Sequence, residues 1–120
     1  MRTIRIFLIV QIALFVLAAL IHSGILVTGH RHQQARIAES VIALVLGAGL
    51  LSTAAGSASM KVIPIAAQAF ALLGTVVGIS TIIIGIGPRS MLDAALHICM
   101  TTLLIVGLTN GYRALHSNTV

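Results

Sequence analysis

Four long apolar stretches follow one another along this chain, with short polar connections between them. An α-helix of about 20 residues rises about 30 Å, which matches the thickness of the hydrocarbon core of a bilayer. We predict four transmembrane helices with approximate spans at residues 4–27, 37–56, 62–86 and 89–111, and residues 57–61 as the second connection. Because the connections are short, consecutive helices should be antiparallel neighbours. The predicted fold is all-α, a single antiparallel four-helix transmembrane bundle covering residues 1–120.

The composition indicates that nearly the whole chain lies in lipid. Hydrophobic residues make up 58% of the 120 residues and charged residues 8%, whereas soluble domains carry about 25% charged residues. So few charges cannot cover a water-facing surface. The expected partner is therefore the lipid bilayer, and the expected location is a bacterial inner membrane.

The positive charge of the chain does not indicate nucleic-acid binding. Seven Lys and Arg residues give a net charge of +5, but they stand near the ends of the apolar stretches, where such residues set topology and contact lipid headgroups. The absence of Trp and the single Tyr leave no platform for stacking bases. One side of the membrane would hold Arg2, Arg5, Lys61 and Arg113, and the other Arg31, Arg36 and Arg89. This one-charge bias favours a cytoplasmic N-terminus, and dual topology with antiparallel dimers is the alternative.

Four ionisable side chains lie inside the predicted spans, where each is costly. They are His22, Glu39, Asp93 and His97. With antiparallel helices, all four lie near the membrane face that carries the loop at residues 28–36. His97 is the deepest, about 12 Å below the interface at about 1.5 Å per residue. We expect these side chains to form one cluster below the mouth of the bundle.

The residue types of this cluster allow more than one chemistry. Two imidazoles and two carboxylates are a plausible ligand set for a divalent transition metal. The same groups also transfer protons, because histidine titrates near neutral pH. Haem held by His22 and His97 is a further alternative, since four-helix bundles bind haem between facing helices. Structural roles compete with these: Glu39 could pair with Arg36 three residues earlier, and Asp93 could cap its helix or hold His97.

A second polar level is predicted nearer the opposite face. Gln11 and Gln68 lie about 10 Å from that face, and Thr75 continues the stripe of Gln68 seven residues later. On the first helix, positions 11, 15, 18 and 22 share one stripe that should face inward. Small residues four apart, at positions 43 and 47 and at positions 74 and 78, allow helices to approach closely.

Two resemblances accompany these patterns. The length, the four spans and residues 37–42 (IAESVI) resemble small multidrug-resistance transporters, which have four helices and one membrane glutamate. That family carries its glutamate in the first helix, whereas Glu39 opens the second span here, so this resemblance implies the plan of the fold without the transport activity. Residues 22–24, 38–40 and 87–97 resemble small bacterial four-helix membrane proteins of unassigned function. This second resemblance implies the same fold and a polar cluster that forms one unit.

The leading hypothesis is a small membrane protein that binds or conducts a cation, a proton or a divalent metal, at the four ionisable residues. A bundle of this size has little room for an internal pathway, which favours a homo-oligomer. One alternative is a non-catalytic accessory subunit of a larger membrane complex, because the chain has almost no mass outside the bilayer. The other is a haem-binding membrane protein. Phosphate-binding, hydrolase and zinc-protease motifs are missing, so the sequence favours a protein without enzymatic activity.

Overall fold

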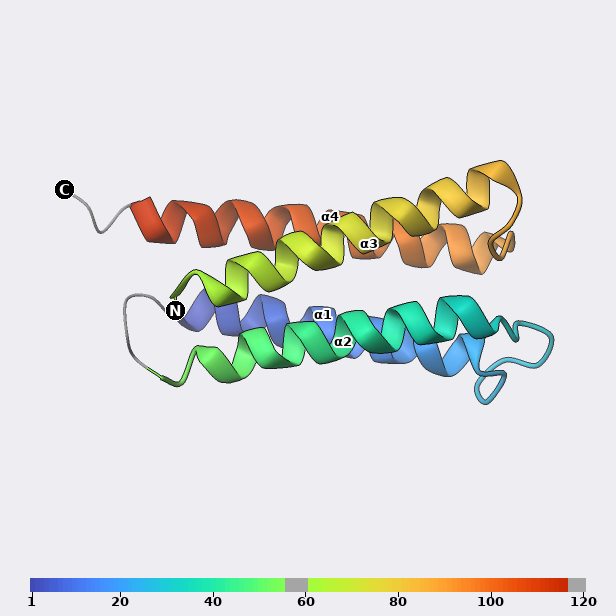
Figure 1. Ribbon diagram of the computed structural model, residues 1–120, viewed down its shortest axis with the longest axis horizontal. Helices are drawn as coiled ribbons and strands as arrows, with labels where there is room; N and C mark the ends of the chain where they lie inside the picture. Colours follow the sequence, from blue (N-terminus) through green and yellow to red (C-terminus); the bar gives the residue numbers. More distant parts are fainter. Residues whose placement is uncertain (56–60, 117–120) are drawn as a thin grey trace.

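The computed structural model describes residues 1–55 and 61–116, and within these ranges the chain forms four α-helices (Figure 1). They are α1 (Arg2–His22), α2 (Gln33–Ser52), α3 (Ile63–Ile84) and α4 (Met91–His116). The predicted all-α four-helix bundle is confirmed. Residues 57–60 of the predicted second connection lie outside the described residues.

The helices run antiparallel along the long axis of a bundle that measures 51 × 24 × 17 Å (Figure 1). Each helix packs against the next one along the chain, and α1 also packs against α4. Across the centre, α1 contacts α3. The carboxyl end of α1, the start of α2, the end of α3 and the start of α4 therefore meet at one end of the bundle, here called the loop end.

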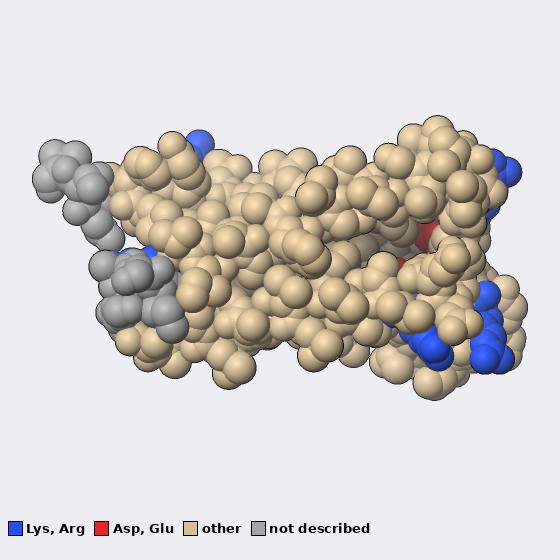
Figure 2. Space-filling model, in the orientation of Figure 1, with Lys and Arg blue, Asp and Glu red and all other residues tan. Residues whose placement is uncertain are grey.

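The core is formed by one face of each helix, and the outer faces are apolar as well. Leu8, Leu46 and Leu104 are fully buried at the centre. By contrast, outward side chains such as Leu44 and Ile83 are 74% and 73% exposed. All four helices are long and apolar enough to span a membrane. On the face shown in Figure 2, Lys and Arg gather toward the two ends of the long axis.

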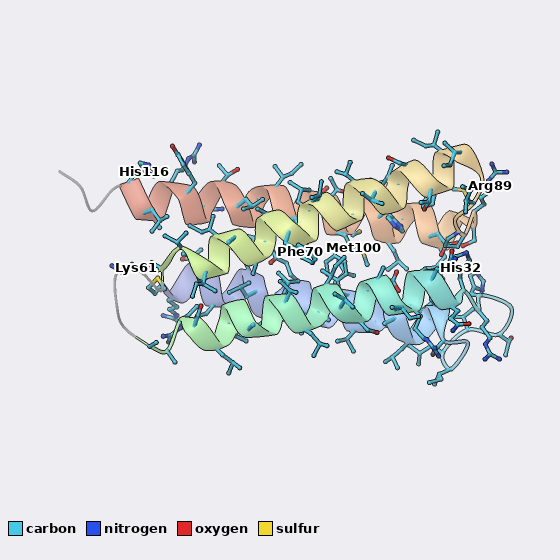
Figure 3. All side chains as sticks on the ribbon, viewed as in Figure 1. His32, Lys61, Phe70, Arg89, Met100 and His116 are labelled. Atoms are coloured by element: carbon cyan, nitrogen blue, oxygen red, sulfur yellow. The ribbon has the colours of Figure 1, made fainter. Side chains whose placement is uncertain are left out.

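The charged ends follow the antiparallel path of the chain. Figure 3 shows Lys61 and His116 near one end of the bundle and His32 and Arg89 near the other. Arg5 reaches from α1 to the end of α2, where its Nη2 donates to the carbonyl of Thr53 at 2.7 Å. This bond connects α1 to the end of α2 at the end of the bundle opposite the loop end.

The first two helices have different bounds from those predicted. Helix α1 ends at His22, five residues before Val27, and the chain then turns through Gly24 with φ +79. A left-handed backbone of this kind favours glycine. The hydropathy of a segment contains no information on backbone conformation, so it does not reveal this turn. Helix α2 begins at Gln33, four residues before Ile37, because the side chain of His32 caps it. The polar residues 33–36 are thus the first turn of α2 and not part of the loop.

The other two helices also differ at their ends. Helix α3 stops at Ile84, where Gly85 has φ +87 and its N–H donates to the carbonyls of Thr81 and Ile82. This is a left-handed helix C-terminus. Helix α4 starts at Met91, after Pro88, and continues to His116, five residues past the predicted end at 111.

Candidate functional site

A histidine held between two carboxylates lies inside the loop end of the bundle. Nδ1 of His22 is 2.8 Å from both carboxylate oxygens of Glu39, and Nε2 of His22 is 2.8 Å from Oδ1 of Asp93. The three side chains come from the end of α1, the second turn of α2 and the first turn of α4. Their exposed fractions are 1%, 6% and 1%. We call His22, Glu39 and Asp93 the triad; they are three of the four predicted site residues.

The proton count of the triad follows from its geometry. Each nitrogen–oxygen contact needs one proton between the two atoms, because two facing lone pairs repel. The triad is therefore either an imidazolium between two carboxylates or a neutral imidazole with one protonated carboxyl group. Both arrangements carry one net negative charge. Glu39 and Asp93 are the only acidic residues of the chain, so the triad gathers all of its acidic side chains.

Asp93 has a second role at the start of α4. Its Oδ2 accepts hydrogen bonds from the N–H of Ser90 at 2.8 Å and from the hydroxyl of Ser90 at 2.5 Å. In return, Ser90 Oγ accepts the N–H of Asp93 at 3.1 Å. This reciprocal pair is a capping box, which satisfies the free N–H groups of a helix start. The predicted capping role of Asp93 is present, and its other oxygen is left for His22.

The structure separates His97 from the triad. Nδ1 of His97 lies 2.8 Å from the backbone carbonyl of Asp93, to which it donates. The carboxylate of Asp93 therefore does not hold the His97 ring, in contrast to one predicted role. Nε2 of His97 makes no hydrogen bond to the described residues and faces α3, where a methyl group on Gly78 would lie 2.8 Å away.

The described residues show no group of three or more His, Cys, Asp and Glu side chains arranged to hold a metal ion. Glu39 is bonded to His22, and within the described chain the predicted ion pair of Glu39 with Arg36 is not formed. Both ring nitrogens of His22 face carboxylate oxygens at 2.8 Å. A metal or haem iron bound to His22 would have to break one of these bonds.

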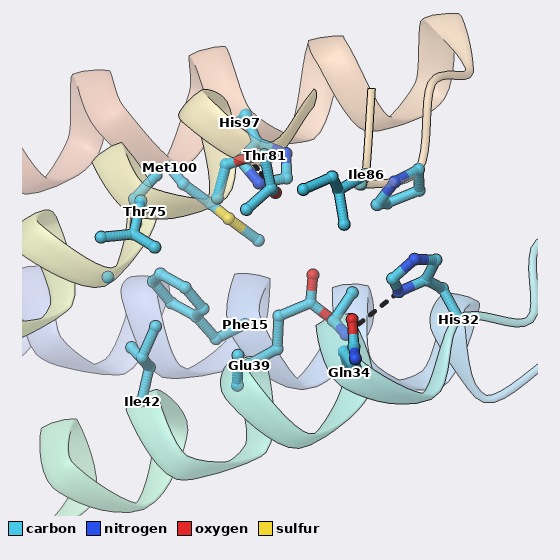
Figure 4. Close-up of a pocket in the computed structure, with 17 residues that line it drawn as sticks. Phe15, His32, Gln34, Glu39, Ile42, Thr75, Thr81, Ile86, His97 and Met100 are labelled. Atoms are coloured by element: carbon cyan, nitrogen blue, oxygen red, sulfur yellow. Dashed lines mark hydrogen bonds between the residues drawn. The ribbon is translucent and has the colours of Figure 1, made fainter. Parts of the chain in front are cut away.

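A cleft opens beside the triad between α2 and α3. Its volume is about 180 Å³, and Phe15 and Met100 lie at its inner part. Glu39 extends into it from α2, and His97 faces it from α4 (Figure 4). In the space-filling view, acidic atoms are visible at the bottom of a hollow near the loop end (Figure 2). The triad is thus buried but connected to the cleft through Glu39, whose side chain is 8% exposed.

His32 lies at the mouth of the cleft and next to the triad. Its side-chain Nδ1 accepts a hydrogen bond from the backbone N–H of Ala35 at 3.2 Å, which caps α2. Its backbone N–H donates to the backbone carbonyl of His22 at 2.9 Å. The rings of His32 and His22 lie 6.5 Å apart in an edge-to-face arrangement. His32 therefore fixes the start of α2 against the end of α1, which places Glu39 opposite His22.

The second polar level forms in part. Nε2 of Gln11 donates to Oε1 of Gln68 at 2.9 Å and to the carbonyl of Leu103 at 3.0 Å. We call Gln11 and Gln68 the glutamine pair. It lies against Gly107, where a methyl group would overlap Oε1 of Gln68. Thr75 is buried, but it donates to the carbonyl of Ala71 and lines the cleft instead of joining the pair.

Ser90 and the cleft were not predicted from the sequence. Ser90 stands three residues before Asp93, which is the spacing of a capping box, so this signal was present. The cleft had a weaker signal: small residues occupy facing positions on its two sides, Ala35 and Ala38 on α2 and Gly74 and Gly78 on α3. Small side chains allow close packing as readily as they leave space, so the pattern alone does not predict a cavity.

Comparisons with known proteins gave no match to a family model, a curated protein or a solved structure.

Proposed function

We propose that this chain is an integral membrane protein of a bacterial inner membrane, with its N-terminus in the cytoplasm, and that the triad binds a proton. Support for the membrane location comes from the four apolar helices, from outward side chains as exposed as Leu51 at 77%, and from basic residues toward the two ends (Figure 2). A chain that is extracted from membranes by alkaline carbonate would contradict this location.

The observation that carries the proton proposal is the position of His22 between two carboxylates. An additional proton would neutralise the net negative charge of the triad, so a proton has a strong electrostatic reason to bind there. Oδ2 of Asp93 already accepts two hydrogen bonds from Ser90. Among the described side chains, Glu39 has hydrogen-bond contacts to His22 alone, and it also borders the cleft. The additional proton therefore binds at Glu39.

The geometry favours a proton over the other cations predicted from the sequence. Metal binding needs free lone pairs, and both ring nitrogens of His22 are engaged with carboxylates. Haem would need His22 and His97 as axial ligands on facing sides of the iron, and the same bonds stand in the way. A proton needs no new ligand. It changes only which atoms of the triad carry hydrogen.

Infrared difference spectroscopy of the purified protein, titrated with acid, tests this proposal. The expected result is a carboxylic-acid C=O band that grows on acidification in the wild type and does not grow in Glu39→Gln. Asp93→Asn should keep a band from Glu39. His116→Gln, at the far end of α4, is the control and should titrate like the wild type.

Two results would contradict the proposal. One is a carboxylic-acid band that persists unchanged in Glu39→Gln. The other is stoichiometric transition metal in the purified wild type that is lost in His22→Gln, which would favour the metal-binding hypothesis. Metal analysis of the same preparations is therefore part of the experiment.

A further inference from the structure

The lining of the cleft beside the triad suits a ligand of a particular chemical class. Proton binding at the triad does not require this lining. The cleft is enclosed mainly by apolar side chains, including Phe15, Ile42 and Met100, and its lining contains no Lys or Arg from the described part of the chain. Its volume of about 180 Å³ far exceeds the ~10–15 Å³ that one water molecule needs. The space between α2 and α3 is therefore large enough for a small organic molecule.

The polar atoms inside the cleft are hydrogen-bond acceptors. The hydroxyls of Thr75 and Thr81 donate their protons to backbone carbonyls of α3, at 2.8 and 2.7 Å, so their oxygen lone pairs remain. The Nδ1–H of His97 is engaged by the carbonyl of Asp93, so Nε2 of the neutral ring carries a lone pair. Glu39 contributes carboxylate oxygens. The inner cleft thus combines several acceptors with the net negative charge of the triad.

The mouth of the cleft differs from its interior. His32 accepts the N–H of Ala35 at Nδ1, so its neutral ring carries a hydrogen on Nε2, and Gln34 adds an amide. Figure 4 shows His32 and Gln34 near the start of α2, on the loop-end side of Phe15 and Met100. A ligand would therefore meet donors at the mouth and acceptors inside.

We propose that the cleft binds an amphipathic primary amine. Its ammonium group would donate hydrogen bonds to Glu39 and to the acceptors on α3 and α4, and its hydrocarbon chain would pack on Phe15 and Met100. A primary ammonium carries three N–H donors and a positive charge, which match the acceptors and the negative charge of the site. The proposal rests on the proposed function in so far as Glu39 is charged when the amine binds.

Calorimetric titration of the detergent-solubilised protein with three probes of equal chain length tests the proposal. Octylammonium should bind saturably with a stoichiometry of one. Octyltrimethylammonium has the same charge without N–H donors and should bind roughly tenfold more weakly or worse, the effect of losing charge-assisted hydrogen bonds. Octanesulfonate, an anion, should not bind. Equal heats for all three probes would show partitioning into the micelle and would overturn the proposal.

Variants in the lining of the cleft test where the amine binds and leave the three residues of the triad unchanged. Ala38→Phe adds a ring at the rim of the cleft and should abolish octylammonium binding, whereas Ala48→Phe, exposed on the same helix and outside the cleft lining, should leave it unchanged. Thr81→Val removes one acceptor at constant shape and should weaken binding several-fold. Circular dichroism of each variant checks that the bundle is intact. Unchanged binding by Ala38→Phe would overturn the proposal.

The failure of this proposal is distinguishable from failure of the proposed function. If Glu39 takes up a proton in the infrared titration but octylammonium does not bind, the amine site is wrong and the proton site stands. If octylammonium binds and Ala38→Phe abolishes this, while the carboxylic-acid band is unaffected by Glu39→Gln, the cleft is a ligand site and the proton proposal is wrong.

Discussion

Replacement of His22 by leucine should destabilise the bundle strongly. The change removes the partner of two buried carboxylates, Glu39 at 6% and Asp93 at 1% exposed. Removing one partner from a buried ionic group costs about 3–5 kcal/mol, because the remaining charge is uncompensated. We therefore expect His22→Leu to lower the free energy of unfolding by about that amount, measured by equilibrium unfolding in mixed SDS and mild-detergent micelles with circular dichroism.

A compensated triple variant tests the reason for this loss. His22→Leu/Glu39→Leu/Asp93→Asn removes the charges together and leaves asparagine as an acceptor for Ser90. Because replacing a whole buried ionic group by apolar side chains is often neutral or stabilising, the triple variant should recover to within about 1–2 kcal/mol of the wild type. A triple variant as unstable as the single one would refute the reasoning, since the loss would then come from packing and not from unpaired charge.

Three further changes test local contacts in the same assay, and the first two have matched controls. Gly107→Ala should cost about 1–3 kcal/mol by forcing the glutamine pair apart, whereas Gly47→Ala, with open space around it, should be neutral or stabilising by up to about 1 kcal/mol; equal effects would contradict the close packing. His32→Ala should cost about 0.5–2 kcal/mol through loss of the α2 cap, and His32→Asn should restore the cap; no difference between them would argue against capping. Ser90→Ala should cost a similar amount by removing the capping box of α4, and a neutral result would count against that motif.

The architecture could be predicted from the sequence because it depends on long-range averages. Four apolar segments of sufficient length and short connections determine an antiparallel bundle. The inward stripe of α1 at positions 11, 15, 18 and 22 was also correct, since all four side chains are buried. This prediction needed only the helical period and the rule that polar groups in an apolar helix face the bundle interior.

Helix ends and side-chain partners depend on local geometry that the pattern does not contain. The predicted span to Val27 continued through Gly24 because hydropathy carries no information on backbone dihedral angles. Glu39 was placed at the start of its helix, beside Arg36, whereas the six residues from Gln33 put it in the second turn. In this position along the bundle axis, the carboxylate of Glu39 contacts the ring of His22. Of the two partners that the sequence allowed for Glu39, Arg36 and the His22 cluster, the structure has His22.

The fourth predicted site residue shows the limit of periodicity. Positions 93 and 97 are four apart, so they point to similar sides of α4. The rotation of about 40° between them is nevertheless enough to turn Asp93 toward α1 and His97 toward α3, where Gly78 leaves room for its ring. Whether two such residues share one site depends on the positions of the neighbouring helices, which one sequence does not specify.

The two polar levels of the bundle are separated by an apolar layer. Gln11 and His22 are eleven residues apart on α1, about 16 Å at the rise of an α-helix. Between these levels Phe15 and Met100 are each 2% exposed. Water and protons need polar partners, and in this layer the described residues offer few besides the hydroxyl of Thr75. A proton bound at the triad would therefore exchange through the cleft at the loop end. Transfer to the opposite face would require Phe15 and Met100 to move apart, so the described conformation fits a site that binds a proton from one side better than an open conducting path.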